Sequence, residues 1–297
     1  AKWFGNPADS LHLLGVTGTN GKTSVTYMLK CILEKAGYKV GLIGTIQNMI
    51  GNEIIAAHNT TPNAYELNSL FALMKAKGCT YVIMEVSSHA LDQCRVYRLN
   101  FDAAMFTNLT QDHLDYHKTM ENYVAMKEKI FANQTADDYT ILNYNDDYCR
   151  KMSNKTKAKI FFFSSSDKLD EGIFLDGEYI HIKWNGIDEN LVNVNDLKIL
   201  GVHNYENVMA AAACAICADV DLNTIRRVLS AFKGVEHRIE YCGTYNGVDC
   251  YNDSKGTNPD AAIRAVLAMK KPIVLIGGGY DKNSEYDEWV KLFEGRV

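Results

Sequence analysis

A glycine-rich segment near the start of the chain, GVTGTNGKTS at residues 15–24, has the residue types that bind phosphate. It stands between an apolar run and a helical pattern over 22–36. Glycines let backbone N–H groups turn toward a phosphate, the helix start adds partial positive charge, and Lys22 adds a full charge. A glycine-rich helix cap is the alternative, because Val16 stands where the usual pattern has glycine. We expect a nucleotide to bind Gly18, Thr19, Asn20, Gly21, Lys22, Thr23 and Ser24.

Side chains that bind metal ions follow later apolar runs. Glu85 ends such a run, where a buried carboxylate is unfavourable unless it is paired or binds a metal. At the end of a strand beside a phosphate loop it is well placed to hold Mg²⁺; a salt-bridged or helix-capping glutamate is the alternative. His113 and His117 are four residues apart, with Asp112 and Asp115 nearby. That pattern fits either a metal site or a solvated, acid-rich turn.

Polar residues in the second half of the chain could hold the rest of a nucleotide. Asn204 and Asn207 stand at the start of an alanine-rich helical stretch. An asparagine offers both the donor and the acceptor that an adenine edge requires, although asparagine also commonly caps helices. The loop NDSKGTN at 252–258 lies between a predicted strand and a predicted helix. It is either a nucleotide-binding loop or a turn capped by aspartate and serine.

Charge and composition exclude several classes of protein. The chain has 297 residues, with 31 Lys+Arg, 36 Asp+Glu and a formal net charge of −5, which argues against a duplex nucleic-acid partner. It has no apolar run long enough to span a membrane, and its first residues show no signal-peptide pattern. We therefore expect a cytoplasmic monomer whose 8 cysteines are reduced. Cys214 and Cys217 lie among small residues, which favours core packing over zinc or redox chemistry.

Strands that alternate with helices predict an α/β fold with a mostly parallel central sheet flanked by helices. Short strands with glycine turns over 164–195 predict a small antiparallel patch. The pattern restarts after Val235, so we expect a first domain over 1–236 and a second over 237–297. The second is expected to begin a Rossmann-like fold that is cut short at Val297. Its predicted elements are strands at 238–243, 247–251 and 272–276 and a helix at 259–269.

Four strings together resemble the Mur ligases, whose ATP loop is also similar to that of the folylpolyglutamate synthetases. They are TGTNGKTS, HNTTP, EVSSHAL and TNLTQDHLDYH. The resemblance implies an ATP-dependent, ADP-forming amide ligase of peptidoglycan precursor synthesis that uses two Mg²⁺ ions. Its partners would be a UDP-muramoyl peptide, whose carboxylate becomes an acyl phosphate, and a free amino acid, whose amine then displaces phosphate. In this family a UDP-binding domain precedes the region and a complete C-terminal domain follows it.

The strings disagree about the branch of the family. HNTTP, EVSSHAL and DHLDYH resemble the MurE-type branch, which adds an amino acid to UDP-N-acetylmuramoyl-L-Ala-D-Glu, and this is the main expectation. Gln111 departs from that branch, in which arginine is common at this position. NDSKGTN resembles the branch that adds D-glutamate to UDP-N-acetylmuramoyl-L-alanine, the first alternative. Two alternatives remain. One is another Mur-like or folylpolyglutamate ligase, and the other is a P-loop nucleotide switch that catalyses no ligation.

The resemblance also implies roles for individual residues. Lys22, Glu85, His113 and Lys127 would be catalytic. Lys127 would be carbamylated, because an ammonium repels Mg²⁺ whereas a carbamate supplies an anionic oxygen ligand. Lys129 is the competing candidate for that role. The implied metal ligands are Thr23, Glu85, His113 and carbamylated Lys127; the implied substrate contacts are Thr60, Thr61, Ser87, Gln93 and Arg95; and the implied further ATP contacts are Asn204, Asn207, Arg238, Asp253, Lys255 and Thr257. For His89 and His117 a structural role is expected.

Overall fold

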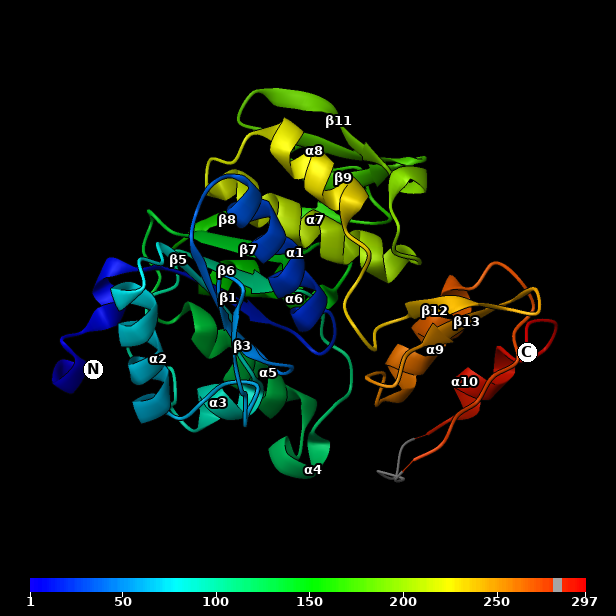
Figure 1. Ribbon diagram of the computed structural model, residues 1–297, viewed down its shortest axis with the longest axis horizontal. Coiled ribbons are helices and arrows are strands. Elements are labelled where there is room, and N and C mark those ends of the chain that lie inside the picture. Colours follow the sequence, from blue (N-terminus) through cyan, green and yellow to red (C-terminus); the bar gives the residue numbers. More distant parts are fainter. Residues whose placement is uncertain (280–284) are drawn as a thin grey trace.

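The structure, a computed structural model, describes residues 1–279 and 285–297 (Figure 1). Its strands are β1 (His12–Thr17), β2 (Val40–Ile43), β3 (Asn48–Ile50), β4 (Glu53–Ile55), β5 (Tyr81–Glu85), β6 (Ala103–Phe106), β7 (Tyr139–Asn143), β8 (Lys159–Ser164), β9 (Gly172–Asp176), β10 (Tyr179–Trp184), β11 (Ile187–Asn193), β12 (Glu240–Tyr245) and β13 (Val248–Asn252). Its α-helices are α1 (Lys22–Lys35), α2 (Ala64–Ala76), α3 (Ser88–Asp92), α4 (Leu114–His117), α5 (Met120–Glu128), α6 (Asp147–Met152), α7 (Val202–Cys217), α8 (Leu222–Ala231), α9 (Pro259–Ala268) and α10 (Asp287–Lys291).

Most described strands form one 11-stranded sheet in the order β11-β10-β9-β8-β7-β6-β1-β5-β2-β3-β4. From β2 to β9 all neighbouring strands are parallel, and hairpins extend the sheet at both edges. The prediction of a mostly parallel α/β sheet is therefore confirmed. The antiparallel strands expected over 164–195 do form, but β9 pairs with β8 in parallel. They are consequently an extension of the main sheet rather than a separate patch.

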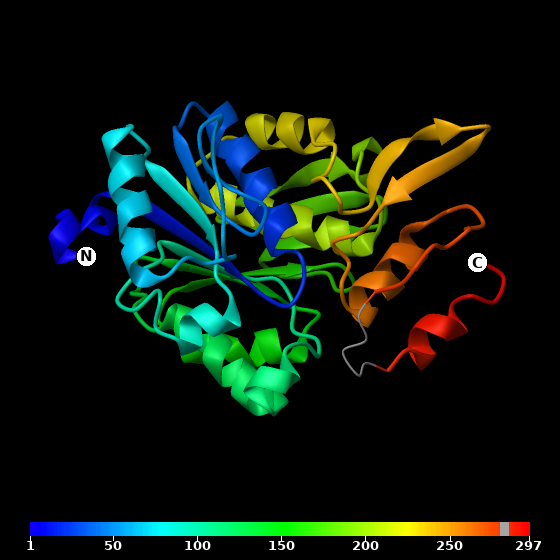
Figure 2. The ribbon, with the colours of Figure 1, turned by 60° about the horizontal axis from the view of Figure 1, so that its bottom comes forward.

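Helices cover both faces of this sheet (Figures 1 and 2), and each face has its own apolar core. Alternate residues of one strand serve the two faces: on β5, Val82 and Met84 pack under α2, whereas Ile83 packs under α1, α7 and α8. Strands buried on both faces read as continuous apolar runs, which is why they stand out in the sequence. None of the described helices is both long and apolar enough to cross a membrane.

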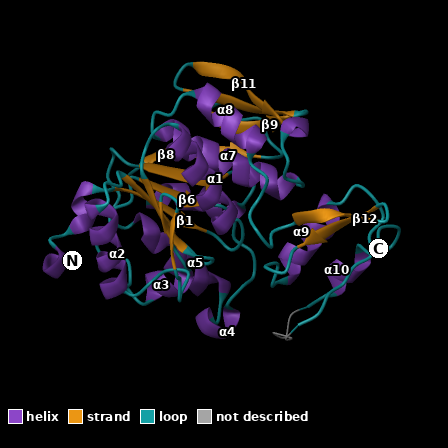
Figure 3. Ribbon diagram, viewed as in Figure 1, coloured by secondary structure: helices purple, strands orange, loops and turns teal. Residues whose placement is uncertain are grey.

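Residues after the 233–239 connection lie beside the main body, where the hairpin β12–β13 and helices α9 and α10 form a separate group (Figures 1 and 3). The predicted hairpin and helix are present, with bounds shifted by one or two residues. The strand predicted over 272–276 is wrong: these residues are not in a strand, and Val274 and Ile276 are 90% and 95% exposed. An apolar run becomes a buried strand only when neighbouring strands pair with it, and no described strand does so here. The division into two domains at 236 stays a prediction.

Candidate active site

The predicted phosphate loop lies at the carboxyl edge of the parallel sheet. Strand β1 ends at Thr17, directly before the loop, and its parallel neighbours β5 and β6 end at Glu85 and Phe106. Because parallel strands finish at the same edge, the segments that follow them are brought together at this point. Loop residue Thr19 donates through its hydroxyl to the carbonyl of Thr110 (3.0 Å), and Asn108 accepts from the N–H of Asn20 (2.9 Å).

The loop itself has the conformation that its glycines predict. Gly18 and Gly21 have φ of 134° and 91°, values that favour glycine. A side chain would also collide at either position, because a Cβ would lie 2.0 Å from the Thr107 hydroxyl at Gly18 and 2.2 Å from Oδ1 of Asn207 at Gly21. Lys22 bends back over the loop and donates to the carbonyls of Gly18 (2.8 Å) and Thr19 (3.0 Å). Burial lowers the pKa of Lys22, against the opposing influence of Glu85 and Asp112.

Substitution of Gly21 separates backbone strain from side-chain collision. Gly37 lies two residues after the end of α1 and has a similar φ of 96°, but it has open space around it. We expect Gly37→Ala to lower the free energy of unfolding by about 1–2 kcal/mol through strain alone. In Gly21→Ala the collision with Asn207 should lower the free energy of unfolding by about 1–3 kcal/mol more. This variant should also lose nucleotide binding. Urea denaturation and ATP titration of both variants test this; equal losses of stability and retained ATP binding in both would contradict it.

Glu85 is held as a ligand-binding carboxylate would be. Its side chain is 1% exposed, and among the described residues it has no ion-pair partner. The Thr23 hydroxyl lies 3.1 Å from both Glu85 oxygens, and Thr45 donates to them through its N–H (3.0 Å) and hydroxyl (2.9 Å). A buried carboxylate that has hydrogen bonds but no cationic partner, and that lies beside a hydroxyl, fits a hard cation such as Mg²⁺. Thr45 was not among the predicted site residues; its position just after β2, at the same sheet edge, was the available signal.

Lys127 is almost fully buried on α5, at 1% exposure. Its Nζ donates to the carbonyl of Gly18 at 2.8 Å, the same oxygen that accepts from Lys22, and lies 4.8 Å from the centre of the Tyr123 ring. Burial, reinforced by the charge of Lys22, lowers the pKa of Lys127 well below its ordinary value. The competing candidate, Lys129, is exposed. The structure thus brings two lysine amines to one loop carbonyl.

The histidines lie beside these lysines but do not gather around Glu85. His113 has φ of 52° and contacts Asp112, with Nε2 3.6 Å from the carboxylate. Burial lowers the pKa of His113, although Asp112 acts in the opposite direction. Over residues 1–279 and 285–297 no group of three or more His, Cys, Asp and Glu side chains could hold a metal ion. Of the four predicted metal ligands, Thr23 and Glu85 contact each other directly, whereas His113 and Lys127 form no hydrogen bond or ion pair with that pair among the described residues. Asp112, which attracts both lysines, is a further site residue that sequence reasoning noted only as a neighbour.

His89 and His117 both contact other side chains of the protein. His117 is buried, and its Nε2 lies 2.9 Å from the hydroxyl of Ser88. The His89 ring packs on Tyr116, with ring centres 4.2 Å apart, and edge-to-face on His113. These contacts agree with the structural roles expected for His89 and His117.

The five predicted substrate-binding residues form one connected group. The Thr61 hydroxyl donates to the carbonyl of Glu85 (2.9 Å) and accepts from the N–H of Ser87 (3.0 Å). Arg95 donates to the Thr61 carbonyl (2.7 Å) and to Gln93 (2.9 and 2.6 Å). The Thr60 hydroxyl is 3.0 Å from that of Thr45. Because Thr61 is fully buried, it can position its neighbours but cannot itself face a ligand in this conformation.

The predicted ATP contacts of the second half fall on two sides: Asn204 and Asn207 at the start of α7, and Arg238, Asp253, Lys255 and Thr257 in the connection between α8 and β12 and in the 252–258 loop. Asn207 is buried against Gly21, and its amide donates to Oδ1 of Asn204 (3.2 Å). On the other side, Arg238 donates to the carbonyl of Lys255 (3.0 Å), and its charge acts on the pKa of Lys22. Asp253 accepts from the N–H of Ile239 at 3.1 Å, and burial raises the pKa of Asp253. The Lys255 and Thr257 side chains are exposed.

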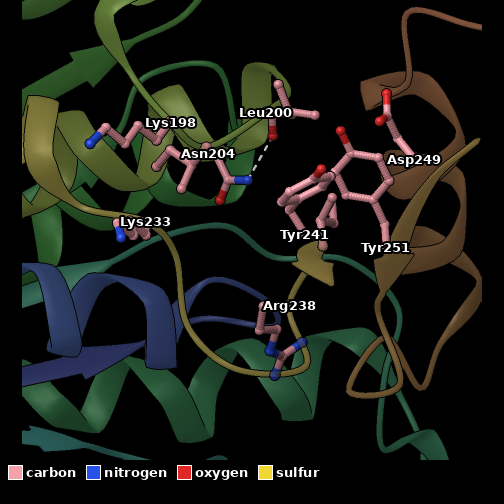
Figure 4. A pocket seen from close by; sticks show the side chains of 10 residues that line it. Lys198, Leu200, Asn204, Lys233, Arg238, Tyr241, Asp249 and Tyr251 are labelled. Atoms are coloured by element: carbon pink, nitrogen blue, oxygen red, sulfur yellow. Dashed lines mark hydrogen bonds between the residues drawn. The ribbon is translucent and has the colours of Figure 1, made fainter. Parts of the chain in front are cut away.

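A cavity of about 370 Å³ lies between these two groups (Figure 4). Its lining residues are Lys198, Ile199, Leu200, Asn204, Lys233, Arg238, Ile239, Tyr241, Asp249 and Tyr251. Asn204 donates to the carbonyl of Leu200 (2.7 Å) on one side, and the rings of Tyr241 and Tyr251 stand on the other. Two aromatic rings opposite an amide can accommodate a flat, polar ring. Asn207, predicted to share this role, does not line the cavity.

The parallel sheet and the glycine loop at its edge define an α/β protein of the phosphate-loop class. Residues 16–215 match the family model of the Mur ligase middle domain. The chain belongs to the Mur ligase family.

Relatives named UDP-N-acetylmuramoylalanine--D-glutamate ligase resemble nearly the whole chain. The protein of Thermoanaerobacter sp. (strain X514) is 41% identical over 285 residues, covering 96% of this chain and 58% of the relative. That of Lachnospira eligens is 40% identical, with 97% and 60% covered, and that of Clostridioides difficile 38%, with 96% and 58% covered. The chain thus spans 58–60% of the length of these relatives. Their names favour the branch indicated by the 252–258 loop, and do not support the MurE-type expectation drawn from the central strings.

Two solved structures show the same fold at low sequence identity. One is a UDP-N-acetylmuramoyl-L-alanyl-D-glutamate--2,6-diaminopimelate ligase, with a TM-score of 0.75 at 23% identity over 97% of this chain and 60% of that one. The other is a UDP-N-acetylmuramoylalanyl-D-glutamyl-2,6-diaminopimelate--D-alanyl-D-alanyl ligase from Acinetobacter baumannii, with a TM-score of 0.67 at 17% identity over 90% and 56%. At this identity the likeness describes the fold and does not distinguish the branches.

Proposed function

We propose that this chain is the ATP-binding part of a ligase that joins D-glutamate to UDP-N-acetylmuramoyl-L-alanine. One observation carries the nucleotide site: Lys22 and Lys127 both donate to the Gly18 carbonyl, and neither has a carboxylate partner among the described ion pairs. The Lys22 amine, without a counter-ion beside a glycine loop, is suited to bind a polyphosphate, and the Lys127 amine next to it is the one proposed below to carry a carbamate. The names of the relatives, together with the NDSKGTN string, support D-glutamate as the amino acid added.

Lys22 would bind and orient the terminal phosphates in this proposal. A substrate carboxylate and ATP are both anionic, so the site must offset their repulsion. Mg²⁺, when bound with ATP, neutralises phosphate charge and stabilises the charge on the transferred phosphoryl group. Thr23 and Glu85 would hold one ion, since the Glu85 carboxylate is buried without a cationic partner. His113 and a carbamate on Lys127 would contribute to a second site.

The surroundings of Lys127 support its carbamylation. Only a neutral amine has the free electron pair that attacks CO₂, and burial next to Lys22 favours the neutral form. The exposed Lys129 lacks this environment. Arg238 and the Asn204 side of the 370 Å³ cavity would bind the nucleoside end of ATP, with Tyr241 and Tyr251 together on the opposite side of the base.

Phosphate release by the complete protein tests the proposed reaction. We expect phosphate release with ATP, UDP-N-acetylmuramoyl-L-alanine and D-glutamate. We expect no release when either UDP-N-acetylmuramoyl-L-alanine or D-glutamate is omitted. A parallel reaction contains UDP-N-acetylmuramoyl-L-Ala-D-Glu and either diaminopimelate or lysine. Release only in the parallel reaction would show that the central strings indicate the correct branch. ATP binding without release in any mixture would favour a nucleotide switch.

A further inference from the structure

Asn20 is bound by two parts of the chain that are far apart in sequence. The central sheet holds its backbone: Asn108 accepts from its N–H (2.9 Å), and the Thr107 hydroxyl donates to its carbonyl (2.6 Å). The start of α9 holds its side chain: Asn20 Nδ2 donates to Asp260 (2.8 Å), and Asn258 Nδ2 donates to Asn20 Oδ1 (3.2 Å). A phosphate-loop residue therefore joins the central sheet to the C-terminal segment, defined here as residues 237–279.

The polarity of these hydrogen bonds is set by the helix cap. Oδ1 of Asn258 accepts from the N–H of Ala261 at 2.8 Å and caps α9. Asn258 must therefore present its NH₂ group to Asn20, and the Asn20 amide can only accept from Asn258 while it donates to Asp260. Each of these three hydrogen bonds joins a donor to an acceptor, so both amides have one orientation.

A second contact holds Asp260 and ties α9 to the central helices. Arg264, one turn further along α9, donates to Asp260 (3.0 Å) and lies 3.6 Å from Glu206 on α7. Glu206 also accepts from the Ser165 hydroxyl (2.7 Å), and its side chain is only 13% exposed. Partly buried charge pairs are screened less by solvent than those on an open surface.

We propose that Asp260 and Arg264 are positioning residues that lock the start of α9 onto the Asn20 side chain and so hold the C-terminal segment against the phosphate loop. The lock keeps Arg238, whose charge acts on the pKa of Lys22, near the phosphate loop, with Asp253 held beside it through the N–H of Ile239; a nucleotide that bridges both parts needs this arrangement. The claim that the lock assists nucleotide binding rests on the proposed function, whereas the existence of the lock does not.

Hydrogen exchange of the nucleotide-free, full 297-residue chain tests the lock. Asp260→Ala should speed exchange of the backbone amides over 18–24 about tenfold, because a hydrogen bond to a charged acceptor is lost. Asn20→Ala should do the same over 258–268, although it is remote in sequence. Glu288→Ala, which removes an exposed carboxylate from α10 paired with Lys291, is the matched control and should change neither.

The effects of Asn20→Ala and Asp260→Ala should be clearly less than additive in the double variant, because both remove the hydrogen bond between Asn20 and Asp260. Asp260→Asn, which keeps an acceptor for Asn20, should remain near wild type over 18–24. Independent, additive effects of the two alanine variants, or effects confined to the mutated segment, would overturn the lock.

MgATP titration by calorimetry then tests its role. We expect Asp260→Ala and Asn20→Ala to weaken binding about tenfold, since the open chain must first close. Tighter binding by Asp260→Ala would show that the contact obstructs the nucleotide and would overturn a positioning role. Failure of the wild-type chain to bind MgATP would instead refute the proposed function, and the exchange data would still decide whether the lock exists.

Discussion

Lys22→Met is expected to lower ATP-dependent ligation about 10³-fold, the upper end of the cost of losing one donor that stabilises developing charge. The substitution keeps an unbranched side chain of similar length on α1 but removes the charge that lies over the Gly18 and Thr19 carbonyls. Steady-state phosphate release and ATP titration measure the effect on turnover and on binding. Stability should change little, because Lys22 has no ion-pair partner among the described residues and methionine is a good helix former.

The matched control is Lys35→Met. Lys35 lies on the same helix, at the end remote from the loop, and is exposed. The net charge of both variants is equal, so any general electrostatic effect on an anionic nucleotide is shared. A loss of activity in Lys35→Met as large as that in Lys22→Met would contradict a specific role for Lys22.

Lys127→Met is expected to lower ligation about 10²-fold without unfolding the protein, if the lysine carbamate contributes to charge stabilisation as a ligand does. A buried amine is costly to desolvate, so methionine of similar volume should be tolerated in its place. Nuclear magnetic resonance of protein equilibrated with ¹³C-bicarbonate should show a carbamate signal that is absent from Lys127→Met.

Lys129→Met provides the comparison for Lys127. Lys129 lies two residues further along the chain but is exposed, so its amine should stay protonated and unmodified. The carbamate signal and the activity should both persist in this variant. Full activity of Lys127→Met would contradict a catalytic carbamate on Lys127. A carbamate signal that disappears only in Lys129→Met would show that Lys129 is the carbamylated residue.

Local sequence patterns were sufficient to predict the strands and helices around the loop. Apolar runs marked β1 and β5 because both faces of these strands are buried, and glycines marked the loop because Gly18 and Gly21 adopt positive φ. The run over 272–276 was misleading for the same reason: an apolar pattern reports a tendency to be buried, whereas a strand requires a partner. The bounds of β12, β13 and α9 shifted by one or two residues, as element ends usually do.

The sequence itself determined the residue types of the loop and the glutamate at the end of a strand, since each depends on a short stretch of chain, whereas Lys127 was indicated only by the family resemblance. Only the tertiary structure decided which of them meet. It placed Thr45 and Thr23 on Glu85 and put Lys127 on the carbonyl that Lys22 also contacts. It also joined Asn20 to Asp260 across 240 positions. Such contacts follow from strand order and helix packing, which bring distant segments to one sheet edge and which no local pattern specifies.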